Sequence, residues 1–268
     1  MRGEVSDAPL ERVYAIGDVH GRFDLFAQLM TIIRRDQDLR PPAQTAIVLL
    51  GNIVDHGPQS AEMVRGCMAL TAASDRFVVL KGSGEDLMAL GLGGDMAAYE
   101  DWLADGGRAT LRSWGAGRRV VDGPATEANR LAAAEAVGPE AIRWLRGLPL
   151  SFRHGDHLFV HAGVRADIDV DEQDEDDLIW IGDAFLRSDA SYGPMIVHGH
   201  FTDESGPVFR HNRIGIDTGA WRTEQLTALG LEDGEVWTLS TAAPLMAALA
   251  AMQDRERVAM SGHRGGMH

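Results

Sequence analysis

The sequence predicts an α/β protein, and three observations indicate this fold class. Strand-like apolar runs alternate with helical patterns at the start of the chain. A middle region, roughly 85–147, has helical composition, and strand patterns return after it. Alternating strands and helices are typical of a sheet with crossover helices. We therefore expect one domain at 12–245 with a helical insertion at 85–147, and flexible tails at 1–11 and 252–268.

Three strands and two helices are expected before the insertion. Apolar spacing predicts helices over 23–36 and from Ser60 to about Ala72. The strands are apolar runs that reach a glycine followed by polar residues, where an open α/β sheet binds its ligands. They are "RVYAIGDV" (12–19), "TAIVLLG" (45–51) and "RFVVLKG" (76–82).

The insertion consists of helical segments broken by glycine clusters. Its Trp102 and Trp114 are expected to pack it against the sheet. The last strand pattern contains "LEDGEV", which predicts a hairpin turn. Strand patterns follow the insertion at 150–164, 195–201, 212–220 and 226–240.

Composition favours a globular protein of a reduced compartment. Of 268 residues, 45% are hydrophobic, and the single Cys67 lies in an apolar run where we expect a buried structural thiol. The sequence opens with no signal-like segment, and charges are too frequent for a membrane span, so we expect a cytoplasmic protein without a membrane partner. The net charge of -15 argues against nucleic-acid binding.

An acidic stretch, "DIDVDEQDEDD" (167–177), carries much of the negative charge. A solvated loop is its simplest interpretation. A surface for a partner protein and a divalent-ion site are the alternatives, and the absence of a glycine at the sixth position disfavours an EF-hand loop. The sequence predicts no oligomeric state.

Histidine and carboxylate side chains follow four of the strand patterns. The segments are "GDVHG", "GNIVDHG", "VHAG" and "VHGHF". Imidazole and carboxylate groups gathered beyond one edge of a sheet are what a divalent transition-metal site requires. The spacing in "GDVHG" lets Asp18 and His20 point from one tight loop toward a common ion. These segments therefore predict a metal site.

With "GEDLM", "WLADGG" and "RIGIDTGA", these segments occur in an order that resembles the calcineurin-like metallophosphoesterases. The chain resembles in particular the bacterial branch of the PPP-type serine/threonine protein phosphatases, and it is also similar to symmetrical diadenosine tetraphosphatases. The resemblance runs from about Arg12 to Leu239. It implies a β-sandwich flanked by helices, and a hydrolase in which two divalent ions (Mn, Fe or Zn) activate water, arginines bind phosphate and a histidine protonates the leaving group.

The resemblance assigns metal ligands. Asp18 and His20 match ligands of the first ion, and His161 and His200 match ligands of the second. Asn52 stands where a metal-bridging aspartate belongs. Because an amide brings no charge to offset the repulsion between two dications, we expect fewer than two ions, or weakly bound ones. The neighbouring His198 is expected to pack or to form a hydrogen bond instead.

Other positions depart further from the family pattern. Asp55 matches the carboxylate that orients the acid histidine, but Gly84 stands at that histidine. His56 and Lys81 stand at phosphate-binding arginines, so that Lys81 is the remaining phosphate-binding candidate. Ser83 replaces an asparagine ligand and Gly182 another arginine that related bacterial sequences carry.

Three interpretations follow. The leading one is a pseudophosphatase that acts by binding or regulation, with a protein partner or a phosphorylated ligand. The second is an active phosphoesterase of phosphoproteins or dinucleotides with an altered, mononuclear site, in which His56 serves as the acid. In the third, no metal binds, and the surviving polar groups hydrogen-bond to one another or to water.

Overall fold

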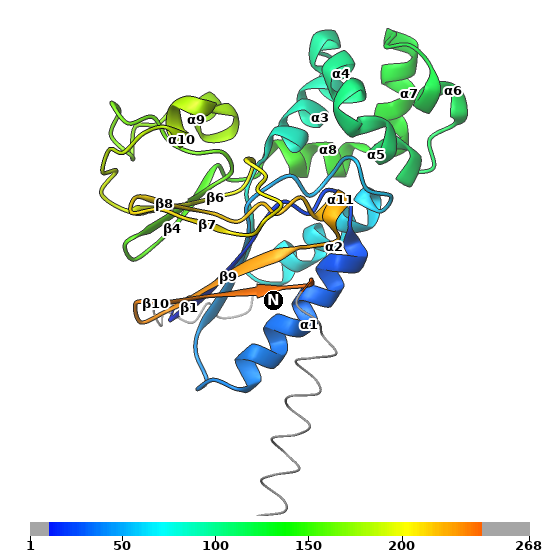
Figure 1. Cartoon of the computed structure of the whole chain (residues 1–268). Helices are drawn as coiled ribbons and strands as arrows, with labels where there is room; N and C mark the ends of the chain where they lie inside the picture. Colours follow the sequence, from blue (N-terminus) through cyan, green and yellow to red (C-terminus); the bar gives the residue numbers. More distant parts are fainter. Residues whose placement is uncertain (1–10, 243–268) are drawn as a thin grey trace, which may run out of the picture.

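The computed structural model describes residues 11–242. The predicted tails, except residue 11, and the last three residues of the predicted domain lie outside the described residues. Two five-stranded sheets stack as a sandwich, with helices on both outer faces and a helical layer at one end (Figure 1). This arrangement confirms the predicted α/β class and the β-sandwich that the family resemblance implies.

The first sheet has the strand order β10-β9-β1-β2-β3. Three parallel strands, all predicted from the sequence, form one part of it, and an antiparallel hairpin at the "LEDGEV" turn forms the other. The strands are β1 (Arg12–Ile16), β2 (Thr45–Leu49), β3 (Phe77–Val79), β9 (Thr227–Glu232) and β10 (Glu235–Ser240).

The second sheet has the order β4-β5-β6-β8-β7, with β5, β6 and β8 parallel. The pattern expected at 150–164 is a hairpin of two strands, because Gly155 (φ +54°) turns the chain there. The short β7 is a strand that the sequence analysis did not predict. The strands are β4 (Ser151–His154), β5 (His157–Val160), β6 (Met195–His198), β7 (Val208–Phe209) and β8 (Arg213–Gly215).

Alternation along the strands divides the apolar core into layers. In β1, Val13 and Ala15 face the second sheet and pack in the same cluster as Phe159. Tyr14 and Ile16 face the opposite way and belong to the larger cluster, which continues into the insertion. A third cluster lies on the outer face of the second sheet. Each sheet is therefore buried on both faces.

Two helices cover the outer face of the first sheet: α1 (Phe23–Asp38) and α2 (Ser60–Ala73). In α1, Leu25, Leu29 and Ile33 recur at helical spacing and are buried. Cys67 of α2 is fully buried, as predicted. On the second sheet lie α9 (Glu175–Trp180) and α10 (Asp183–Leu186), neither of which the sequence analysis predicted.

The predicted insertion is a layer of short helices beyond the carboxyl ends of the strands (Figure 1). Asp95 caps α4 by accepting the N–H groups of Ala97 and Ala98. Trp102 is fully buried in the main core, and Trp114 packs against it, as expected for both. The helices are α3 (Ser83–Gly93), α4 (Met96–Trp102), the π-helical turn η1 (Leu103–Gly107), α5 (Arg108–Ser113), α6 (Arg118–Asp122), α7 (Glu127–Val137) and α8 (Pro139–Arg146).

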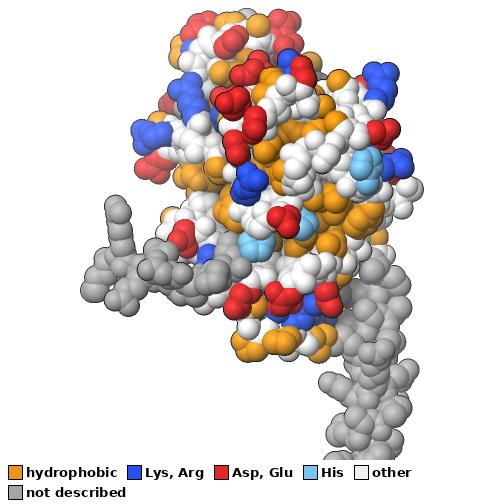
Figure 2. Space-filling model, turned by 90° about the vertical axis from the view of Figure 1, so that its left-hand side faces the viewer, with side chains coloured by type: hydrophobic (Ala, Val, Ile, Leu, Met, Phe, Trp, Pro, Cys, Tyr) orange, Lys and Arg blue, Asp and Glu red, His pale blue; other side chains and the backbone are white. Residues whose placement is uncertain are grey.

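Charged side chains of both signs cover the face that Figure 2 shows, where Lys and Arg are interspersed with Asp and Glu. Within residues 11–242, no helix combines the length and apolar character needed to cross a bilayer.

Candidate functional site

The parallel strands of both sheets end at one edge of the sandwich, and the loops that follow them form the candidate site. These loops hold every residue that the sequence analysis predicts as a metal ligand. They are Asp18 and His20 after β1, Asn52 after β2, His161 after β5 and His200 after β6.

A series of contacts joins these five side chains. Asn52 Nδ2 donates to Asp18 Oδ2 at 3.0 Å, and His20 Nε2 lies 3.9 Å from the same oxygen. The backbone N–H of His200 lies 3.2 Å from Asp18 Oδ1. The His200 ring packs edge-on against His161, with 5.1 Å between ring centroids. The fold therefore brings the five predicted residues into one cluster.

Two of the histidines present a lone pair to this cluster. Nδ1 of His20 lies 3.0 Å from the carbonyl oxygen of Val54, and Nδ1 of His161 lies 2.8 Å from that of Leu50. Because a carbonyl only accepts, each Nδ1 carries the proton and each Nε2 keeps a lone pair that can bind a cation. The Nε2 of His161 lies 3.5 Å from the Ser83 hydroxyl. Burial lowers the pKa of His161 well below its usual value and that of His20 to about 3. Both rings are therefore neutral at neutral pH.

The Asn52 amide is held at both ends. While Nδ2 donates to Asp18, Oδ1 accepts the N–H of Gly84 at 2.8 Å and the hydroxyl of Ser83 at 3.2 Å. The loops after β2 and β3 approach closely enough for these bonds because Gly82 lacks a side chain. A Cβ on Gly82 would lie 2.4 Å from the backbone nitrogen of Asn52. At the position of the family's bridging carboxylate, both ends of the Asn52 amide are therefore engaged in hydrogen bonds within the protein.

The donor set has the chemistry of a divalent-ion site, with an amide at the bridging position. A carboxylate and neutral imidazoles suit a transition metal, but Asn52 brings no charge between two ions. Across the described residues, no three His, Cys, Asp or Glu side chains are placed to hold an ion as they stand. An ion at Asp18 would have to displace the Asn52 amide.

A second buried carboxyl group, that of Asp217 after β8, adds negative charge to the site. Burial and then the charge of Asp217 raise the pKa of Asp18 well above its usual value. Burial also raises the pKa of Asp217, whose carboxylate accepts from the Thr202 hydroxyl and the Gly219 N–H. Two buried carboxyl groups in each other's field are stabilised by a cation.

Asp55 does not orient a histidine. Its Oδ1 accepts from Trp102 Nε1 at 2.9 Å and from the Thr110 hydroxyl at 2.7 Å, which ties the insertion to the loop after β2. Its Oδ2 faces Gly84, where a Cβ would lie 2.8 Å away. A Cβ at position 84 would therefore crowd the Asp55 carboxyl group. Burial raises the pKa of Asp55 well above its usual value.

Lys81 is already paired. Its Nζ lies 2.6 Å from Oε1 of Glu175, which begins α9 at the end of the acidic stretch. Trp180 of α9 also donates to Asp86 of α3 at 3.2 Å. The interpretation of 167–177 as a solvated loop is thus wrong for its end, which is helical and contacts the site. A phosphate group at Lys81 would compete with the Glu175 carboxylate for the ammonium group.

The fold and these loops agree with a comparison against protein families. A model of the calcineurin-like phosphoesterase family matches residues 11–224. The chain belongs to the calcineurin-like phosphoesterases. Members of this family use divalent metal ions, which agrees with the donor set around Asp18.

Curated relatives within the family carry one enzyme name. The chain is 29% identical over 152 residues to a symmetrical bis(5'-nucleosyl)-tetraphosphatase of Methylococcus capsulatus, covering 57% of this chain and 43% of the relative. It is 32% identical over 156 residues to a protein of the same name from Acidovorax sp., covering 57% and 44%. The matches thus span under half of the length of these relatives.

Solved phosphoesterase structures share the fold. A putative diadenosine tetraphosphatase superposes with a TM-score of 0.56 at 17% identity, covering 87% of this chain and 96% of that structure. A cold-active protein-tyrosine phosphatase of a psychrophilic Shewanella superposes with a TM-score of 0.54 at 18% identity, covering 87% and 80%. At these identities the likeness concerns the fold alone.

His56, at a phosphate-binding position of the phosphoesterase family, packs between two aromatic rings. It stacks on Trp221, with ring centroids 4.6 Å apart and 16° between the planes, and meets His20 at 4.8 Å. Burial lowers its pKa, so the ring is mainly neutral at neutral pH. A general acid must carry its proton, which makes His56 a poor replacement for the missing histidine.

The backbone of the phosphoesterase site is strained. Among described non-glycine residues, seven have positive φ, a conformation that costs of order 1–3 kcal/mol each. Five of them belong to the site: His20, Asn52, Asp55, His56 and His200. Such strain persists only where the surroundings fix it. It indicates that the fold maintains this cleft geometry even where the family's side chains are replaced.

Several site residues were not predicted from the sequence. Asp217 and Trp102 lie within the quoted segments "RIGIDTGA" and "WLADGG", and Trp221 directly follows the first, so those segments were the available signal. No quoted segment contains Thr110 or Arg222. Glu85, from "GEDLM", supports the site by accepting the backbone N–H of Asn52 at 2.7 Å.

His198 packs as expected and provides a pH-dependent prediction. It is buried between Phe185 and Phe201, and Nδ1 contacts the Gly199 carbonyl oxygen. Burial lowers its pKa to about 4. In the unfolded chain His198 takes up a proton near pH 6.5, whereas the buried ring in the folded protein does so only near pH 4. The contribution of the neutral His198 ring to the free energy of unfolding is therefore complete above pH 6.5 and is lost as the pH falls toward 4.

Between pH 7.5 and 5.5 in EDTA, we expect wild type to lose about 1 kcal/mol more unfolding free energy than His198→Asn. Urea titrations at both pH values measure the difference. The exposed-site variant His211→Asn should follow the wild type. Equal losses in wild type and His198→Asn would contradict the assignment.

Proposed function

We propose that this protein is a pseudophosphatase. It binds a phosphorylated ligand or partner in the cleft of the phosphoesterase fold, holds at most one divalent ion, and retains little or no hydrolytic activity. The glycine at position 84 carries the proposal, because it stands where the family resemblance places the general acid and has no side-chain proton to give. Loss of an acid alone costs roughly a hundredfold to ten-thousandfold in rate.

The Asn52 and Lys81 interactions support the same conclusion. The Asn52 amide is hydrogen-bonded to Asp18, Ser83 and Gly84. Because an amide is neutral, it also brings no charge to the bridging position. Lys81 is paired with Glu175. A divalent ion held by Asp18 and the imidazoles would act as a Lewis acid on a phosphoryl oxygen. The chain itself would position the phosphate group, but glycine stands at position 84, where the family resemblance places the group that protonates the leaving alkoxide.

The proposal is tested by metal content together with turnover. After incubation with Mn²⁺ or Zn²⁺ and removal of free ions, plasma mass spectrometry should find one ion per chain or fewer. Hydrolysis of para-nitrophenyl phosphate should be negligible. Two ions per chain, with turnover typical of a hydrolase that Asp18→Ala and His200→Ala abolish, would contradict the proposal.

A second candidate is an active phosphoesterase with a mononuclear site. The free Nε2 atoms of His20 and His161 favour it, because they suit one catalytic ion. The relatives' name makes a dinucleoside polyphosphate the substrate to test, beside a phosphoprotein. Without an acid, such an enzyme should hydrolyse para-nitrophenyl phosphate far faster than an alkyl phosphate.

The second candidate has two versions, which differ in whether His56 is the general acid. If His56 is the acid, His56→Ala should abolish hydrolysis of the alkyl phosphate and spare that of the nitrophenyl ester. The matched control His211→Ala should change neither.

Within the proposal, the bacterial cytoplasm is the expected location, and a protein partner is expected rather than nucleic acid or membrane.

A further inference from the structure

The short helix α11 (Ala220–Thr223) is connected to the centre of the cleft by an unbroken series of contacts. Trp221 stacks on His56, and His56 meets His20 edge-on. His20 Nε2 lies 3.9 Å from Asp18 Oδ2. The rings of His56 and His20 therefore link α11 to the Asp18 carboxyl group.

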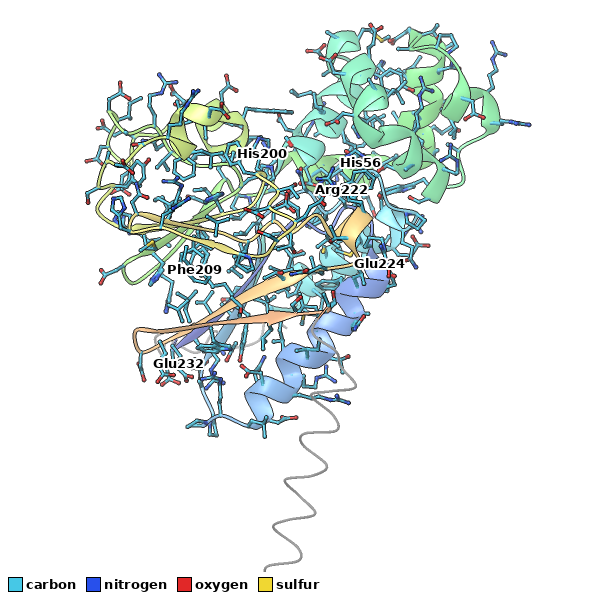
Figure 3. All side chains as sticks on the ribbon, viewed as in Figure 1. His56, His200, Phe209, Arg222, Glu224 and Glu232 are labelled. Carbon is cyan, nitrogen blue, oxygen red and sulfur yellow. The ribbon has the colours of Figure 1, made fainter. Side chains whose placement is uncertain are left out.

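Arg222 brings a positive charge to this place. Its guanidinium carbon lies 5.4 Å from the Trp221 ring centre. Figure 3 shows Arg222 and His56 in the region where the insertion meets the sandwich. After burial, which is the larger cause, the charge of Arg222 contributes to the lowered pKa of His20 and of His56. The guanidinium thus acts electrostatically on the cleft.

The cleft holds α11 in position. Asp217 Oδ1 accepts the N–H of Gly219 at 2.9 Å, and Gly219 has φ +70°, a conformation that glycine adopts without cost. The Thr223 hydroxyl donates to the Thr218 carbonyl oxygen at 2.9 Å. The same buried carboxyl group that neighbours Asp18 therefore fixes the start of the helix that carries Arg222.

Three cations described near the cleft differ in how firmly they are paired. Arg22 donates to both carboxylate oxygens of Asp24, at 2.9 and 2.7 Å. The Lys81 side chain is 11% exposed and is paired with Glu175. Arg222 is 46% exposed and contacts only one oxygen, Oε1 of the 57% exposed Glu204, at 2.7 Å.

Exposed pairs of the Arg222–Glu204 kind contribute little to stability. An incoming anion can therefore replace the Glu204 carboxylate at small cost. Arg222 is also the better chemical match for phosphate than Lys81, because its planar fork can bind two oxygens at once.

We propose that Arg222, supported by the Trp221–His56 stack, binds the phosphate group of the ligand beside the loops that hold His20 and His56. This rests on the proposed function, in which the cleft holds a phosphate-bearing ligand. At positions 56 and 182, where the family resemblance places arginines, this chain has histidine and glycine. Arg222 supplies from α11 the guanidinium that those positions lack.

Inorganic phosphate, titrated into the metal-free full chain by calorimetry, tests the proposal. Arg222→Ala should weaken binding about tenfold or more, since a hydrogen bond to a charged group is lost. Arg222→Lys should lie between Arg222→Ala and wild type, because it keeps the charge without the fork. Glu204→Gln should bind about threefold more tightly, because it removes the competing carboxylate.

Arg187→Ala is the matched control. Arg187 is also an exposed arginine paired with one carboxylate, that of Asp183, and its removal should leave phosphate binding unchanged. Equal phosphate affinity in Arg222→Ala and wild type would overturn the proposal, and so would an absence of binding by wild type. The calorimetric titration measures binding and not turnover. If a separate assay found hydrolysis, the pseudophosphatase proposal would be refuted, but the role of Arg222 in binding phosphate would stand.

Discussion

Glu85→Ala is expected to lower the free energy of unfolding by about 3 kcal/mol or more, because hydrogen bonds to a buried charged group are strong. The Glu85 carboxylate is fully buried and accepts four backbone N–H groups. They belong to Asn52 (2.7 Å), Ile53 (2.9 Å), Val54 (3.2 Å) and Gly82 (2.9 Å). Alanine would leave these donors buried without an acceptor.

Urea denaturation followed by circular dichroism measures this loss. Glu62→Ala is the matched control, since Glu62 is likewise the third residue of its helix, α2, but is exposed. Its loss should stay within about 0.5 kcal/mol. If both variants lost the same stability, the carboxylate would not be what holds the loop after β2.

Asn52→Asp is expected to strengthen Mn²⁺ binding roughly a hundredfold, so that the stability gained on adding saturating Mn²⁺ exceeds the gain of wild type by about 2.7 kcal/mol. Without metal the variant should be less stable, because it places a second carboxylate about where Asn52 Nδ2 now lies, 3.0 Å from Asp18. The substitution also removes the amide N–H that donates to Asp18, so an ion no longer has to displace it.

Thermal unfolding with EDTA and with increasing Mn²⁺ measures both effects. Asn212→Asp provides the control, because Asn212 is a buried amide that donates to the carbonyl oxygens of Ser188 and Ala190, away from the cleft. That variant should lose stability without any gain from Mn²⁺. An identical Mn²⁺ response in wild type and Asn52→Asp would refute the account of the bridging position.

Much of this fold was predictable because strong periodicity determined it. The three parallel strands of the first sheet, α1, α2 and the terminal hairpin follow directly from apolar spacing and one turn signal. The clustering of Asp18, Asn52 and His161 was predictable for a related reason. Parallel strands deliver their loops to one edge, so residues distant in sequence meet there.

Other features depend on tertiary contacts that no local pattern reveals. The acidic stretch has a loop's composition, yet Lys81 and Arg165 attract Glu175 and Asp177 and help to hold α9 in place. The stack of Trp221 on His56 joins loops far apart in the chain. Whether a buried carboxyl group such as Asp55 orients a catalytic ring or anchors a helix depends on which donors the fold places beside it.

The Gly84–Asp55 contact also has a consequence for attempts to install a general acid. A histidine placed at position 84 would bring its Cβ to within 2.8 Å of a carboxyl oxygen whose partner oxygen is held by Trp102 and Thr110. The Asp55 carboxyl group would have to rotate to admit the new side chain, and that rotation would disturb its bonds to the insertion. Gly84→His therefore couples the chemistry of the site to the anchoring of the helical layer.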